Sequence, residues 1–335
     1  MADRPKPVGY HAEMSEALAT RLAELAELCR LGRHNFHVAS GVDGFRPIPG
    51  TESEVADQAT LQADWPYGPW PGDGPALQMH QVGLMVSNSA AGRLGELAAL
   101  LEAGEVMFSL PTHSRGVMEQ CARLFRIYTQ PYLPHIGTYP MPPAATKAMF
   151  AAAHLEMFDG VFSALKLAQL YLDADPTDAD RQAEVTHVTA ELNRMQGAFT
   201  PLYDAATTDL TNPNKLKIEG AELQKMTPLV NEIAEWIWPD PAKRPKSMYK
   251  DFSGHAHGSL DADIELWEIV DSDSRRDLIR KLPRDFVETN VLTALALFHR
   301  AFARLVGFYG WDEEPLNEFG DSIVAAFPGR FTYNP

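Results

Sequence analysis

The sequence predicts an all-α protein that folds as a single body of about nine or ten helices. Apolar residues recur at spacings of three and four over long stretches, which is the period of an α-helix. No five-residue segment alternates convincingly between apolar and polar residues, as a half-buried strand would. The chain also contains no internal repeat and no low-complexity tract. These observations favour a helical body over a sandwich, a barrel or a solenoid.

Length and composition are those of a globular protein. The chain has 335 residues, of which 45% are hydrophobic and 22% charged. A chain of this length buries about three quarters of its unfolded surface, so it needs neither a disulfide nor a metal to fold. Two cysteines, Cys29 and Cys121, exclude a disulfide scaffold and a four-cysteine zinc site. We therefore expect one helical domain over residues 1–335, with lobes 1–200 and 201–335 as an alternative division, and no cofactor or metal.

The charge balance restricts the partners. The formal net charge is -16, and such a field repels the phosphates of nucleic acids and anionic membranes. No uncharged apolar run reaches the roughly 18 residues of a membrane span. Residues 1–11 lack the apolar core of a signal peptide. We expect a cytoplasmic protein that binds neither nucleic acid nor membrane, and nothing in the sequence indicates its oligomeric state.

The first helix is predicted at about 15–30, with Ser15 as its cap. Residues 38–76 are too rich in proline and glycine for a long element. Within them, residues 65–70 place two tryptophans and a tyrosine beside prolines, which predicts a loop that packs on the helical body as a lid. Further helices are predicted at about 76–105, 111–129, 144–172, 179–196, 227–238, 260–270, 274–281, 284–308 and 314–327. The helix at 144–172 is apolar on most sides, which is typical of a central helix.

The segment 249–259 carries the densest group of reactive side chains. Histidine is suited to proton transfer near neutral pH, and two glycines allow a shaped backbone. A helix start with packed aromatics and histidines bonded to backbone explains the same residues equally well. The catalytic candidates are His257, Tyr249, Ser253 and Lys250, and His255 is a substrate-binding candidate.

A second group lies on the helix predicted at 111–129. Arg115, Glu119 and Arg123 follow one another at intervals of four residues, so they line one stripe and can form a ladder of ion pairs. Arg126 lies on the same side, and a solvated amphipathic face is the favoured interpretation. If another part of the chain covers the ladder, it instead supplies a buried guanidinium pair for a carboxylate or a phosphate.

Two further histidines give weaker signals. Glu184 and His187 have the spacing of a di-iron ligand pair, but only one such pair occurs, in a very polar stretch. His154 and Glu156 lie on the apolar helix, where polar groups must be satisfied. One histidine and one glutamate do not make a metal site, so a satisfied core pair is the favoured interpretation.

Two motifs together carry a family resemblance. Residues 114–123, with Arg115 and Glu119, and residues 249–258, with Tyr249, Lys250, Ser253 and His257, resemble motifs of uncharacterised all-helical actinobacterial proteins. The resemblance covers about residues 80–305 and implies a helical fold without an assigned activity. The chain is also distantly similar to HEPN domains, whose ribonuclease members use an arginine and a histidine. Lys250 stands in the place of that arginine and lacks its planar fork.

Three functional hypotheses follow from these residues. The first is a helical protein with a small-molecule pocket, acting as an enzyme through the His257, Tyr249 and Ser253 cluster and binding substrate through Arg115, Glu119, Arg123 and His255. The second is a HEPN-like ribonuclease or nuclease remnant, which requires a basic groove beside His257. The third is a non-catalytic interaction protein.

Overall fold

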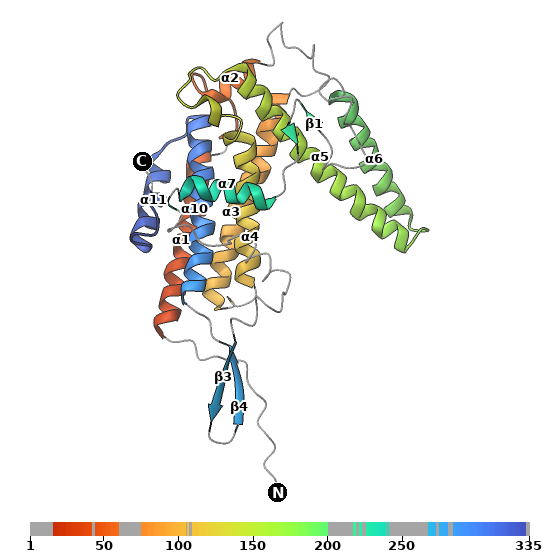
Figure 1. Cartoon of the computed structure of the whole chain (residues 1–335). Helices are drawn as coiled ribbons and strands as arrows, with labels where there is room; N and C mark the ends of the chain where they lie inside the picture. The colour runs from red at the N-terminus through yellow and green to blue at the C-terminus, as the bar shows by residue number, and fades with distance from the viewer. Residues whose placement is uncertain are drawn as a thin grey trace.

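The computed structural model describes residues 16–41, 44–59, 75–104, 106, 109–199, 217–218, 221–222, 226–238, 240, 267–272, 275–280 and 284–332. Nine α-helices occur among these residues, so the all-α class and the single helical body are confirmed. Figure 1 shows the long helices side by side in a bundle, with one helical hairpin and one β-hairpin projecting from it.

Four long helices make the bundle: α1 (Glu16–Ser40), α3 (Pro75–Ala103), α4 (Ser109–Leu124) and α10 (Arg284–Tyr309). α3 packs against α1 and α4, and α10 also packs against α1 and α4. Most of α10 is buried, and its aromatic residues Phe298, Phe302 and Phe308 lie within the core. α11 (Glu314–Ala326) covers α1 and α10, and α7 (Met226–Ile237) packs against α4 and α10.

α4 does not end as a regular helix. It continues into a π-helical turn, η1 (Phe125–Thr129), closed by the bond from the Gln130 N–H to the Phe125 carbonyl at 2.9 Å. Pro131 follows and cannot donate a backbone hydrogen bond, so the helix must stop there. All five residues of the turn are buried. π-helical turns inside or beside α-helices occur frequently at functional sites.

α5 (Pro143–Ala174) differs from the expected central helix. Its first half packs on α3 and η1, but its second half leaves the bundle and pairs with α6 (Ala179–Phe199) as a projecting hairpin (Figure 1). The apolar composition that predicted a central position therefore continues into solvent: Leu167 is 51% exposed and Leu170 is 64% exposed. Only the first half of α5, with Met149 and Phe150, contributes to the hydrophobic core.

Several predicted boundaries were wrong. α1 runs ten residues beyond the predicted end, because Asn35 and Phe36 are buried inside the bundle and extend its core contacts. α2 (Glu52–Ala59) is a helix within the stretch assigned to a lid loop, and Arg304 of α10 pairs with its Glu52 at 2.6 Å. The proposed lid segment, residues 65–70, lies outside the described residues.

Two short antiparallel hairpins are not predicted by the sequence pattern. β1 (Lys217–Ile218) pairs with β2 (Ala221–Glu222), and β3 (Trp267–Ser272) pairs with β4 (Arg275–Arg280). The prediction of helices at 260–270 and 274–281 is therefore wrong for residues 267–270 and 275–280, which belong to β3 and β4. Ser272 pairs with Arg275, so only two residues join these strands. A two-residue connection of this kind favours a hairpin.

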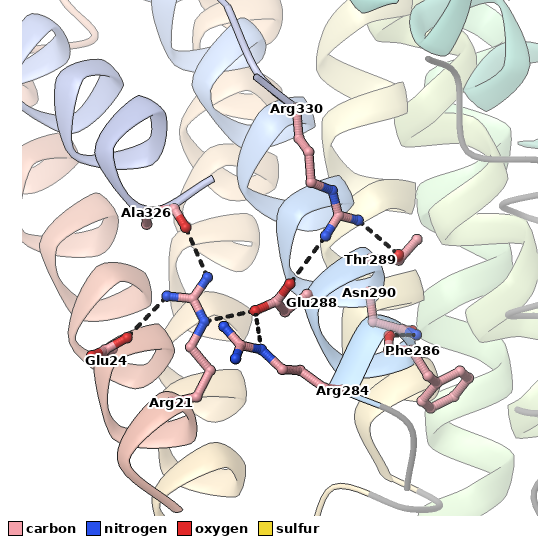
Figure 2. A network of polar contacts seen from close by, with 9 residues as sticks. All are labelled: Arg21, Glu24, Arg284, Phe286, Glu288, Thr289, Asn290, Ala326 and Arg330. Carbon is pink, nitrogen blue, oxygen red and sulfur yellow. Dashed lines mark hydrogen bonds and ion pairs between the residues drawn. The ribbon is translucent and has the colours of Figure 1, made fainter. Parts of the chain in front are cut away.

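The carboxylate of Glu288 joins α1 and the C-terminal segment to α10 (Figure 2). Glu288 Oε1 accepts hydrogen bonds from Arg21 Nε and Arg284 Nε, both at 2.8 Å, and Glu288 Oε2 accepts from Arg330 Nη1 at 3.1 Å. Arg21 also donates to the Ala326 carbonyl at the end of α11. Burial alone would raise the pKa of Glu288, but the hydrogen bonds and charges of Arg284 and Arg21 outweigh it and lower that pKa. The cluster fastens α1, α10 and the C-terminal segment together.

Candidate functional site

The described structure brings together only part of the predicted site. His257, Tyr249, Ser253, Lys250 and His255 all lie outside the described residues. Their catalytic and binding roles stay predictions, as does the HEPN-like hypothesis, which depends on Lys250 and His257. The three residues on α4 are described and can be placed.

Arg115 and Glu119 form the first step of the expected ladder. Arg115 Nε donates to Glu119 Oε1 at 2.8 Å, and both side chains are partly exposed. Arg123 turns instead toward α5, where its Nε lies 3.8 Å from Glu156 Oε2. A second helix therefore covers one end of the stripe. The sequence predicts a buried guanidinium pair only if another part of the chain covers the stripe, and α5 covers this end of it.

A second arginine, Arg126 on the π-helical turn, also faces Glu156, whereas Arg123 keeps 33% of its side chain exposed. Arg126 is 3% exposed and pairs through Nη2 with Oε1 of Glu156, whose side chain is 2% exposed. Burial, helped by the charge of Arg123, lowers the pKa of Arg126 to about 10, while Asp159 opposes the change. Arg126 therefore stays charged at neutral pH. We call Arg123, Arg126 and Glu156 the Glu156 cluster.

The Glu156 cluster contains polar atoms without hydrogen-bond partners among the described residues. These atoms are Arg126 Nε and Nη1, Arg123 Nε and Glu156 Oε2. Buried polar groups are nearly always hydrogen-bonded, and each exception calls for an explanation such as a ligand, an ion or a water. Two guanidinium groups face the Glu156 carboxylate, and the negative charge of Asp159 also acts on Arg126.

The π-helical turn carries a second buried polar group on another side. Tyr128 Oη donates to the Met79 carbonyl at 3.1 Å and lies 3.1 Å from Tyr309 Oη. Tyr309 Oη in turn lies 2.8 Å from His80 Nδ1. Because the Tyr128 hydrogen is used on Met79, Tyr309 donates to Tyr128 and His80 Nδ1–H donates to Tyr309. We call these three side chains the Tyr–His chain.

The Tyr–His chain holds neutral groups. Burial lowers the pKa of His80 to about 4 and raises the pKa values of both tyrosines. Gly83 makes the chain possible, because a Cβ at that position would lie 2.0 Å from Tyr128 Oη. Arg304 Nε donates to the Tyr128 carbonyl at 2.7 Å and so fixes the backbone of the turn. The turn that presents Arg126 is therefore held rigidly from α3 and α10.

Other candidate chemistry is not supported among the described residues. No group of three histidine, cysteine, aspartate or glutamate side chains there is arranged to hold a metal ion. His187 and Glu184 lie on the solvated helix α6. Burial raises the pKa of Cys29 to about 12 and that of Cys121 further, so neither is a thiolate at neutral pH. His154 is buried with its pKa lowered to about 3, so it is a neutral core histidine.

Two described helices, α5 and α10, are long and apolar enough to cross a membrane by length and composition alone. Core helices of soluble proteins pass the same test, so the expectation of no membrane span stays a prediction.

Sequence reasoning placed Arg126 on the solvated side of α4 and missed the tyrosines. The available signal was its position between Phe125 and Ile127, two apolar residues that both prove buried. Arg126 follows Arg123 by three residues and so lies on the same side of the helix, and the sequence does not show that α5 covers this side.

Comparisons with known proteins add no relative: no family model, curated protein or solved structure matches the chain.

Proposed function

We propose that the protein binds a small carboxylic acid at the Glu156 cluster. The observation that carries the proposal is the buried guanidinium of Arg126, whose Nε and Nη1 have no hydrogen-bond partners among the described residues. Guanidinium groups recognise carboxylates through short, charge-assisted hydrogen bonds. A carboxylate would accept hydrogen bonds from these donors.

Glu156 narrows the class of ligand. Its Oε2 has no hydrogen-bond partner in the described structure and can only accept while the group is ionised. A ligand that satisfies both sides of the cluster carries a hydrogen-bond donor next to its carboxylate. α-Amino acids and α-hydroxy acids have that pattern. Inorganic phosphate is disfavoured, because Glu156 would repel its dianion more strongly than it repels a carboxylate with a single charge.

The proposal concerns binding. Catalysis by His257, Tyr249 and Ser253 is a separate prediction that rests on the sequence, and the small-molecule site would be its substrate-binding part. Enzyme and non-catalytic binding protein are both compatible with the Glu156 cluster.

The test is calorimetry with acids that differ only in the group beside the carboxylate. Alanine, lactate and propionate form one such series, and leucine, 2-hydroxyisocaproate and isocaproate form a longer one. The proposal predicts binding of the amino or hydroxy member and weaker binding of the unsubstituted acid, since the latter offers no hydrogen-bond donor to Glu156 Oε2. Binding should be abolished in Arg126→Met and kept in Arg194→Gln, an exposed arginine on α6. Equal binding to wild type and Arg126→Met would refute the proposal.

A second variant serves as a control in case Arg126→Met does not fold. Replacing a whole buried ion pair by apolar residues is often neutral for stability, whereas removing one partner is not. The double variant Arg126→Met/Glu156→Met should therefore fold and still fail to bind. A folded double variant that binds the acid normally would also contradict the proposal.

A further inference from the structure

The projecting hairpin of α5 and α6 exposes a face that nothing in the described structure covers. We call residues 160–199 the helical arm (Figure 1). α6 covers one side of α5, where Phe162 and Ala168 are buried. Leu167 is 51% exposed and Leu170 is 64% exposed. Tyr171 is 48% exposed and is contacted by α6, because the Arg181 guanidinium lies 4.9 Å from the centre of its ring. A cluster of large apolar side chains on a projecting helix is typical of an interaction surface.

Charges at the two ends of this face are of opposite sign. Lys166 and Asp173 are seven residues apart, so they lie on the same side of α5, about 10 Å from each other along its axis. Both are exposed and both are positioned by neighbours: Lys166 Nζ lies 4.8 Å from the centre of the Phe162 ring, and Asp173 Oδ1 accepts a hydrogen bond from Gln169 at 2.8 Å. Leu170 lies between them.

We propose that the helical arm is a homodimerisation surface, in which α5 of one copy packs antiparallel to α5 of a second copy. A two-fold axis beside Gln169 and Leu170 places Lys166 opposite the partner's Asp173, and Asp173 opposite the partner's Lys166. An interface around a two-fold axis must be complementary to itself, and a face with a cation at one end, an anion at the other and leucines between them meets that condition. The two arms together form an antiparallel four-helix bundle.

The same residues argue against a lipid surface as the occupant. Within the arm, the cations are Lys166, Arg181 and Arg194, whereas the acidic residues are Asp173, Asp175, Asp178, Asp180, Glu184 and Glu191. Helices that lie on membranes carry an excess of lysine and arginine on the polar face, and this arm has the opposite balance. The whole chain, including the arm, has a formal net charge of -16. The proposal is independent of the ligand site, because the arm contains no residue of the Glu156 cluster.

The test is sedimentation equilibrium of the full chain over a wide range of concentration. The wild type should show a reversible monomer–dimer equilibrium. Leu170→Lys should shift it to monomer, because it places a charge at the two-fold axis. Leu84→Lys, at an exposed leucine on α3, should leave it unchanged. A chain that is monomeric throughout, or a dimer unaffected by Leu170→Lys, would overturn the proposal.

A charge exchange tests the antiparallel register. Lys166→Asp and Asp173→Lys should each weaken the dimer several-fold, because each puts like charges opposite one another, and the double variant should restore it. Both positions are exposed, so circular dichroism should show unchanged helicity. Failure of the double variant to recover would exclude this register. Binding of a monomeric chain to neutral phosphatidylcholine vesicles through Leu170 would overturn the proposal in favour of a lipid occupant.

Discussion

Glu288 and Glu156 are both buried carboxylates surrounded by arginines, and they differ in how completely they are satisfied. Both oxygens of Glu288 accept hydrogen bonds, from Arg21, Arg284 and Arg330. Glu156 has one oxygen paired with Arg126 and one without a hydrogen-bond partner among the described residues. Residue types are similar, so composition does not separate a structural cluster from a binding site, although the Arg126–Glu156 pair is more deeply buried than the pairs of Glu288 with Arg284 and Arg330. The two clusters are distinguished instead by the donors and acceptors that have no hydrogen-bond partner among the described residues.

The largest effect is expected from breaking the Glu156 cluster on one side. Arg126→Met should lower the free energy of unfolding by up to about 3–5 kcal/mol, because it leaves the buried carboxylate with only the partly exposed Arg123, 3.8 Å away, as a cation. The double variant Arg126→Met/Glu156→Met should recover most of that loss. Urea unfolding of the two variants measures both values. A single variant as stable as the double variant would show that Glu156 is not buried in charged form.

The stability contributions of His80 and Glu288 should depend on pH over different ranges. His80, which holds the π-helical turn, has a pKa lowered to about 4 by burial. As the pH falls, this histidine is therefore protonated in the unfolded chain before it is protonated in the folded protein. Its stabilisation is complete above the unfolded pKa near 6.5 and should fall by about 3 kcal/mol at most as the pH drops to 4. Glu288, with a lowered pKa, should lose stabilisation only below the unfolded pKa of about 4.3.

Urea unfolding between pH 7 and pH 4 checks this order. His80→Asn keeps a hydrogen-bonding group near Nδ1 and removes the titration, so its stability should vary less with pH over that range. An unchanged pH dependence in His80→Asn would contradict the assignment of a neutral buried His80.

Glu288→Gln should break the satisfied cluster without touching the ligand site. The amide weakens hydrogen bonds from three arginines, and a bond to a charged group contributes about 1.5–3 kcal/mol net. Because Arg284 and Arg330 are partly exposed, the total loss should lie near the value for one such bond. Calorimetry should show unchanged affinity for the acid. Loss of binding in a folded Glu288→Gln protein would remove the distinction between the clusters.

The smallest expected effects come from two glycines on α3. Gly83→Ala places a Cβ against Tyr128 Oη and should cost about 1–3 kcal/mol through overpacking, with weaker acid binding because the π-helical turn shifts. A Cβ at Gly92 would meet only open space, so Gly92→Ala should stabilise by about 0.5–1 kcal/mol. Thermal unfolding of both variants is the measurement, and equal effects would show that Tyr128 does not depend on Gly83.

Helical periodicity predicted the class and most helix positions, because a buried stripe must repeat with the period of the helix. It predicted 284–308 and 314–327 to within one residue of α10 and α11. It failed where tertiary contacts decide the structure. α5 is apolar along its length but leaves the bundle halfway, and the β3–β4 hairpin lies where two helices were expected.

The site was predictable only in part. The spacing of Arg115, Glu119 and Arg123 correctly predicts a helical stripe, and covering by a second helix is the condition that it sets for function. That α5 covers the stripe, and that its Glu156 meets Arg123 and Arg126, depends on tertiary packing. The apolar pattern of a single helix does not reveal which other helix packs against its polar side.

The most direct test of the central claim observes the guanidinium of Arg126 while acid is added. In a ¹⁵N-labelled protein, the arginine Nε–H resonance that is absent from Arg126→Lys identifies this group. If Arg126 holds the carboxylate, that resonance shifts saturably with α-amino or α-hydroxy acid, while the Nε–H resonance of Arg21 in the Glu288 cluster does not. An Arg126 resonance that stays in place while calorimetry reports binding would contradict the account.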